Sequence, residues 1–212
     1  MEKKYILTDD VIDFNSHTLH RIKAVRDFDC VKAGDLGGFI ESEKNLDHDG
    51  AAWVTGDARI FGDAVVSSAA VVSGDAVVSG DAHVSGVAVV SGAARVTGDA
   101  WVTGVARIFG DAVVSGAAVV SGDAFVTDSA RVSGAAVVSG AADFAVISGF
   151  GRVFRTTTFF RCKDNLVRCQ CGCFYGTVDE FRSKVRETHG SSKYAKEYLM
   201  IADLMELHFK ED

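Results

Sequence analysis

The chain has 212 residues, no proline, 48% hydrophobic residues and a net charge of −7 at neutral pH. A chain of this length ordinarily holds about ten prolines, so their absence predicts a long backbone hydrogen-bond ladder, and the apolar fraction excludes a disordered protein. Residues 1–50 contain 7 Lys/Arg and 11 Asp/Glu, residues 51–146 contain 4 and 9, and residues 147–212 contain 11 and 9. The first two segments are therefore acidic, which excludes nonspecific nucleic-acid binding. Any anion site is expected in the last third, which has a net positive charge.

Residues 1–50 predict an N-terminal β cap. The first residues alternate and carry acidic side chains where a signal peptide needs an apolar run, and the sequence has no apolar run long enough to span a membrane. We therefore expect a cytoplasmic protein without membrane contact, whose cysteines are reduced. Two strands around a turn at Asn15–Ser16 are expected. The glycine-rich segment 34–38 lacks the Lys-Ser/Thr of a phosphate loop, so we interpret it as a turn that leads into the next module.

Residues 51–146 repeat a six-residue unit without insertion. Alanine stands at every sixth position from Ala52 to Ala142, and Val or Ile follows two residues later from Val54 to Val138. Glycine fills 13 of the 15 matching positions between Gly56 and Gly140. Each unit spans three pleats of a strand, with Ala and Val on one face and a corner at Gly. The pattern predicts a parallel β-solenoid with three of these hexads in each coil.

Positions three hexads apart stack in such a solenoid, so the outward residues sort into three columns. The second column carries arginine at every other coil, whereas the third is uncharged. An uncharged apolar column of this height predicts a homo-oligomer, with a trimer favoured. The predicted interface on this third face is Val65, His83, Trp101, Val119 and Val137.

The repeat between Gly50 and Val146 resembles the hexapeptide-repeat proteins, which form left-handed parallel β-helices. The segment HRIKAVRDFDCVKAGDLGGFIESEKNL (His20 to Leu46) is similar to the lead-in of a bacterial and prophage subgroup whose members are often labelled acyltransferases. The resemblance implies a left-handed, three-sided coil and, as an alternative function, acyl transfer from acyl-CoA held at a subunit interface. The candidate catalytic bases are then His83 or His189, although no coil shows the loop that those enzymes use.

Residues 147–212 predict a C-terminal α/β module made of a hairpin and two helices. Strands are expected at 156–162 and 166–174 around Lys163-Asp164-Asn165. Thr177 and Glu180 form a capping box for a helix that ends near His189, and a second helix is expected from Lys193 to about Phe209. One stripe of this second helix can pack on the hairpin, which leaves Met200, Leu204 and Leu207 for a partner chain or the solenoid end.

The cysteines of this module allow two interpretations. Cys169, Cys171 and Cys173 with His189 suggest a zinc site, but residues i and i+2 on a strand place their Cβ atoms ~6.5 to 7 Å apart, too far for two ligands of one tetrahedral zinc. We prefer small buried side chains beneath the helices, because a two-residue turn directs all four thiols of the module to the side of Phe160.

The same register places Arg161 opposite Arg168 and Phe159 opposite Gln170. Like charges directly opposite each other destabilise a sheet, so the pair requires a bound anion, an acidic surface of the same protein, or a different register. Two guanidinium groups beside an aromatic ring suit a phosphate or a nucleotide. These four residues are the predicted ligand site.

No nucleophile, paired base or complete metal-ligand set is visible in the sequence, so it predicts no cofactor, with acyl-CoA and zinc as the alternatives. The leading hypothesis is a non-enzymatic binding or scaffold protein. It would be an oligomeric solenoid that presents its C-terminal module to an anionic or nucleotide-like ligand or to a protein partner.

Overall fold

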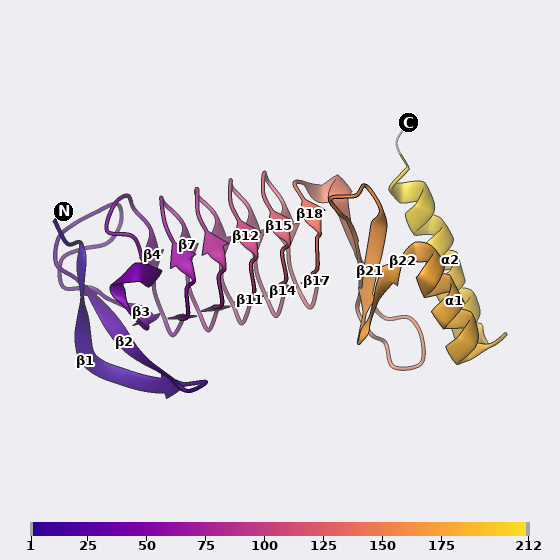
Figure 1. Ribbon diagram of the computed structural model, residues 1–212, viewed down its shortest axis with the longest axis horizontal. Coiled ribbons are helices and arrows are strands. Elements are labelled where there is room, and N and C mark those ends of the chain that lie inside the picture. Colours follow the sequence, from indigo (N-terminus) through magenta and orange to yellow (C-terminus); the bar gives the residue numbers. More distant parts are fainter. Residues whose placement is uncertain (1, 211–212) are drawn as a thin grey trace.

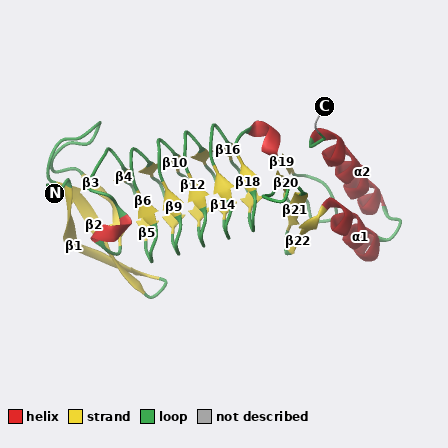
Figure 2. Cartoon of the chain, turned by 45° about the horizontal axis from the view of Figure 1, so that its top comes forward, coloured by secondary structure: helices red, strands yellow, loops and turns green. Residues whose placement is uncertain are grey.

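The computed structural model describes residues 2–210. An N-terminal antiparallel hairpin, a β-solenoid, a four-stranded sheet and a helix pair follow one another along the long axis (Figure 1). The solenoid consists of short strands joined by loops, and the two long helices lie together at the C-terminal end (Figure 2). The predicted fold class, a mainly β solenoid between a β cap and a C-terminal α/β module, is confirmed.

The solenoid contains three stacks of five short strands each, and every strand pairs in parallel with its equivalent in the next coil, as Val71 pairs with Val89. The first stack is β4 (Trp53–Val54), β7 (Val71–Val72), β10 (Val89–Val90), β13 (Arg107–Ile108) and β16 (Phe125–Val126). The second is β5 (Arg59–Ile60), β8 (Val77–Val78), β11 (Arg95–Val96), β14 (Val113–Val114) and β17 (Arg131–Val132). The third is β6 (Val65–Val66), β9 (His83–Val84), β12 (Trp101–Val102), β15 (Val119–Val120) and β18 (Val137–Val138). The three predicted columns are thereby confirmed.

The repeat explains both the core and the ladder. The Ala and Val/Ile positions between Ala52 and Val138 are fully buried, so identical small side chains fill the interior of every coil. Backbone amides bond to carbonyls of the next coil, as from Val71 to Ala88 at 2.9 Å. The corner glycines from Gly56 to Gly134 have φ between 58° and 72°, and Ser68 and Asp128 adopt the same left-handed conformation at the two positions where glycine is missing. The ladder uses the amides on both sides of the buried Val or Ile, as at Val71 and Ser73, which accounts for the absence of proline at these positions of the repeat.

The N-terminal module closes the first end of the solenoid. β1 (Tyr5–Phe14) and β2 (His17–Ala24) form the expected hairpin, and β3 (Leu36–Ile40) pairs with β2 and, in parallel, with β5. A 3₁₀ helix, η1 (Glu43–Asn45), follows, and the Asn45 amide donates to two carbonyls of the first coil. The buried Lys4 ammonium lies 3.5 and 3.4 Å from the carbonyl oxygens of Asp49 and Gly50. The open ladder edge is therefore covered.

The C-terminal sheet has four strands, not the two of the predicted hairpin. After η2 (Ala141–Asp143) its order is β19 (Phe144–Ile147), β20 (Thr157–Arg161), β21 (Val167–Cys171) and β22 (Phe174–Thr177). One side of the sheet lies on the last coil, where the Arg131 amide donates to the Thr158 hydroxyl and Ser133 bonds Gln170. The other side carries the helices (Figure 1). The break of the repeat at Phe144 marks the start of this sheet.

The predicted register between β20 and β21 is wrong by one residue. Cys162 and Leu166 bond around a three-residue turn, with Asn165 in the left-handed region at φ 60°. Phe159 therefore lies opposite Cys169, and Arg161 lies opposite Val167 rather than Arg168. A shift of one residue also reverses faces, so Cys162 packs with the solenoid core and Cys169 beneath the helices. The expectation that all four thiols share one side is thus incorrect.

The two helices match their expected positions. α1 (Val178–His189) begins at the predicted capping box of Thr177 and Glu180. α2 (Lys193–His208) buries Tyr198, Ile201 and Met205 in the cluster that contains Phe159 and Cys169. The second stripe of α2, Met200, Leu204 and Leu207, is exposed by 72, 54 and 70%.

Candidate ligand-binding pocket

The four residues of the predicted ligand site lie in separate environments. The Arg161 guanidinium donates to the Phe209 carbonyl at 2.8 Å and lies 3.6 Å from the Asp143 carboxylate. Arg168 makes a bidentate ion pair with Asp164 at 2.7 and 2.6 Å, which lowers the pKa of Asp164 to about 2. The cross-strand arginine pair that motivated this site is absent from the described sheet, because the register differs.

The other two members of that site have structural roles. Phe159 is fully buried and meets Phe181 edge to face at 5.8 Å beneath the helices. Gln170 lies on the opposite side of the sheet, where it accepts a hydrogen bond from Ser133 and donates to the Gly172 carbonyl at 3.1 Å. The structure therefore does not bring the four residues together around one ligand.

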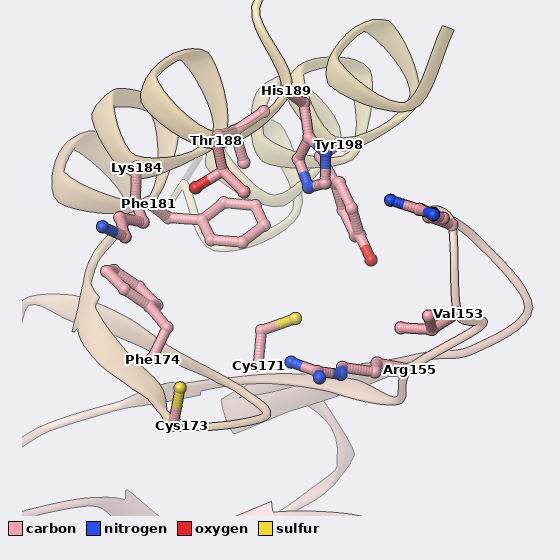
Figure 3. Close-up of a pocket in the computed structure, with 12 residues that line it drawn as sticks. Val153, Arg155, Cys171, Cys173, Phe174, Phe181, Lys184, Thr188, His189 and Tyr198 are labelled. Atoms are coloured by element: carbon pink, nitrogen blue, oxygen red, sulfur yellow. The ribbon is translucent and has the colours of Figure 1, made fainter. Parts of the chain in front are cut away.

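The sheet, α1, α2 and the loop before β20 instead surround a cavity of about 340 Å³, shown in Figure 3. Its floor is the end of the β21–β22 hairpin, where Gly172 turns with φ 60°. The helices form its roof, with Thr188, His189 and Tyr198 above the floor (Figure 3). Arg152 and Val153 of the loop contribute the side wall, and the side chain of Arg155, from the same loop, lies along the floor (Figure 3).

The lining is basic. Arg152, Arg155 and Lys184 contribute three formally positive side chains, His189 adds an imidazole, and none of the twelve lining residues is acidic. Within residues 2–210, neither Arg152 nor Arg155 forms an ion pair with a carboxylate. Lys184 lies 3.0 Å from Glu187 on the exposed side of α1. The cavity is thus a positively charged site in a protein that is acidic overall.

Aromatic rings from β22, α1 and α2 form a continuous wall of the cavity. Phe174 and Phe181 have centroids 5.7 Å apart, and Phe181 meets Tyr198 at 5.7 Å with an interplanar angle of 84°. The His189 ring stacks on Tyr198 at 5.8 Å. A flat apolar group can lie against such a wall while a negative group reaches the arginines.

The Tyr198 phenol and the Cys171 thiol both belong to the lining of the cavity. Burial, followed by the electrostatic effect of Cys171, raises the pKa of Tyr198 above its ordinary value. Tyr198 is therefore a neutral phenol at physiological pH, and its hydroxyl also lies 3.4 Å from the Phe150 carbonyl oxygen. Both side chains point into the cavity in Figure 3.

The loop wall is held by contacts distant in sequence. The Gly151 amide donates to the Glu197 carboxylate at 3.0 Å, and Gly151 has φ 74° beneath Tyr198. On the opposite side, the capping box of Thr177 and Glu180 sets the start of α1. These two contacts position the cationic loop and the aromatic helix across from each other.

The cysteine and histidine candidates are partly assembled. Cys171, Cys173 and His189 line the cavity together, whereas Cys169 is buried in the core, where burial raises the pKa of its thiol. Within the described part of the chain, no three side chains of the metal-ligand types lie close enough to hold one ion. The arrangement does not fit the zinc alternative.

The other catalytic alternative, His83, lies on the outer surface of the solenoid. Its ring is 4.8 Å from that of Trp101. Neither His83 nor His189 is hydrogen-bonded to a carboxylate in residues 2–210. The acyltransferase alternative stays a prediction.

Sequence reasoning missed the loop between β19 and β20, which supplies Arg152 and Arg155. Its segment Gly149-Phe150-Gly151-Arg152 combines flexible, aromatic and basic residues within the basic last third of the chain. That composition could have indicated a basic loop near a binding site, but no local sequence pattern shows where the loop packs.

Comparisons with known proteins identify the repeat. Residues 58–74 and 106–122 match a family model described as the YdcK beta solenoid repeat. The chain has no match among curated proteins. Across the described residues, neither long helix combines the length and apolar character needed to cross a membrane. The chain is a β-solenoid repeat protein, and its repeats are similar to those of the YdcK type.

Proposed function

We propose that the protein is a non-enzymatic, oligomeric binding protein whose C-terminal module binds a small anionic ligand with an aromatic ring, such as a nucleotide. The main support for this proposal is the cavity, in which Arg152, Arg155 and Lys184 lie with an aromatic wall and no lining side chain is acidic. The proposal keeps the ligand class expected from the sequence and moves the site from the outer strands to the cavity beneath the helices.

The chemistry of the lining supports this ligand class. A guanidinium group binds phosphate oxygens through paired N–H donors and also stacks on flat rings. Phe174, Phe181 and Tyr198 offer surfaces for a base, with little preference among bases because every base has a π face. A volume of about 340 Å³ falls within the range of ~300–1,000 Å³ of small-molecule sites.

A second copy of the chain is the proposed partner of the third face. Trp101 is 51% exposed there, and the outward column of Val65, His83, Trp101, Val119 and Val137 contains no formal charge with neutral histidine. The first column carries Arg107, and the second carries Arg59, Arg95 and Arg131. Like charges would therefore oppose the association of either face with the same face of another copy. The exposed stripe of Met200, Leu204 and Leu207 is a further apolar surface available to a partner copy, and a trimer is the favoured order.

Native mass spectrometry of the purified full chain tests both parts of the proposal. We expect an oligomer and either a retained small anion or saturable binding of an added nucleoside monophosphate. Arg155→Ala should weaken that binding by ~10-fold, the loss of one charge-assisted contact. Arg107→Ala, on the outer surface of the solenoid, is the matched control and should leave it unchanged. A monomer that retains and binds no nucleotide would overturn the proposal.

A further inference from the structure

A second cavity of about 650 Å³ adjoins the first, between the C-terminal sheet and the last coil of the solenoid. Its lining includes Arg131 of β17, Thr156, Gln170 of β21 and Ser129. None of its seven lining residues is aromatic and none is acidic. It therefore shares the positive charge of the first cavity but has hydrogen-bonding groups in place of the aromatic wall.

Arg155 and Cys173 line both cavities. The Arg155 guanidinium lies beside Gly172, where an added Cβ would be 2.6 Å from its Nη1 atom. Figure 3 shows this side chain along the floor of the first cavity, directed toward Cys171. The glycine thus leaves room for an arginine at the boundary between the two cavities.

Arg131 is available on the far side of that boundary. Its backbone amide is held by Thr158, while its side chain is exposed and forms no ion pair in residues 2–210. Two guanidinium groups from different modules, one on the solenoid and one on the loop, therefore face one polar cavity. A single phosphate bound in the first cavity can neutralise the cationic side chains there, but it leaves Arg131 of the second cavity without a negative partner.

We propose that the ligand is a nucleoside polyphosphate, with its base in the first cavity and its phosphate chain passing Arg155 into the second cavity toward Arg131. This inference rests on the proposed function and specifies the substrate class of the same site. The first cavity combines an aromatic wall with cationic side chains and suits the base and the first phosphate, whereas the second cavity, without aromatic residues, suits the rest of the phosphate chain.

Isothermal titration calorimetry of the full chain tests this inference. The ligands are the four common ribonucleoside monophosphates, the matching triphosphates and inorganic triphosphate. We expect the triphosphate of the preferred base to bind at least ~10-fold tighter than its monophosphate, since one further charge-assisted contact contributes about that factor. Inorganic triphosphate should bind more weakly than the nucleotide, because the aromatic wall stays empty.

Arg131→Ala should remove the preference for the triphosphate and leave monophosphate binding within ~2-fold, because Arg131 lies outside the first cavity. Arg95→Ala, in the same column two coils away, is the matched control and should retain the preference. Thermal unfolding of each variant confirms that the chain is folded. Equal affinities for mono- and triphosphate, or an equal loss of both in Arg131→Ala, would overturn this inference and leave the proposed function standing. Absence of binding by every nucleotide would overturn both.

Discussion

The hydroxyl of Tyr198 occupies the space that a side chain at residue 151 would need. Gly151 has φ 74°, and the nearest atoms to an added Cβ there all belong to Tyr198. Gly149, two residues earlier, has φ 85° but an open surrounding. Comparing substitutions at Gly149 and Gly151 therefore separates the energetic cost of the left-handed backbone conformation from the cost of a steric clash with Tyr198.

We therefore expect Gly149→Ala to lower the free energy of unfolding by ~1 kcal/mol through backbone strain alone. Gly151→Ala should cost a further ~1–3 kcal/mol, because Tyr198 must move. It should also weaken nucleotide binding, since the loop carries Arg152 and Arg155. Chemical denaturation and titration of both variants provide the measurements. Equal destabilisation by the two substitutions would contradict the contact.

Lys4 predicts a pH-dependent stability. Burial lowers the pKa of its ammonium to about 8 from the ordinary 10.5, although the Asp47 carboxylate acts in the opposite direction. Between pH 8 and 10.5 the unfolded chain then binds more protons at this residue than the folded chain, so its contribution to stability rises with pH. The total change is roughly 3 kcal/mol at most.

Lys4→Met removes this proton and isolates its effect from the other groups that titrate above pH 8. The free energy of unfolding of the natural protein, minus that of Lys4→Met, should increase from pH 7.5 to 9.5. In the fold Tyr5 stays neutral over this range, because burial raises its pKa above the ordinary value. Its ionisation in the unfolded chain is the same for both proteins and cancels in the difference. Parallel stability profiles for the two proteins would show that Lys4 titrates normally.

The third face predicts which aromatic residue controls association. Trp101→Arg should convert the oligomer to monomers, because it places a positive charge at the centre of the proposed contact. Phe125→Arg tests the same change on the first face, where Phe125 is 48% exposed, and should leave the oligomer intact. Sedimentation velocity at micromolar concentration distinguishes the two. Dissociation by the Phe125 variant alone would assign the interface to the first face.

The cysteines should differ in reactivity according to their positions. Cys30 and Cys173 are exposed, whereas Cys162 and Cys169 are buried, and burial raises the pKa of the Cys169 thiol. A maleimide reagent at neutral pH should label the first two rapidly and the second two only after unfolding. Mass spectrometry of proteolytic fragments locates the label. Saturating nucleotide should protect Cys173, which lines both cavities, and not Cys30.

The solenoid was predictable because every hexad repeats the same local information. Ala52 and its equivalents fall on one face in any strand, and the stacking of every third hexad follows from three corners per coil. The helices were predictable for a similar reason, since the capping box at Thr177 is a local sequence pattern. The β20–β21 register was not, because the segment from Lys163 to Leu166 is compatible with two- and three-residue turns. That one residue decided which face Phe159 and Arg168 occupy.

The pocket depends on contacts that no sequence window contains. Glu197 holds the Gly151 amide from 46 residues away, and Arg131 reaches the second cavity from the solenoid. The basic composition of residues 147–212 indicated the correct end of the molecule but not the residues that assemble. The two strands missed at the edges of the sheet, β19 and β22, are short and adjoin stronger patterns.

Because successive coils have equivalent edges, the number of coils sets the length of the solenoid. The first coil is closed by the N-terminal cap and the last by the sheet, but each intermediate coil pairs in the same register with both neighbours. Removing one block of three hexads should therefore rejoin equivalent edges and shorten the solenoid by ~4.8 Å, with both ends preserved. The distance between the cap and the C-terminal cavities is therefore set by the number of coils, and it changes by one coil for each block of three hexads removed or added.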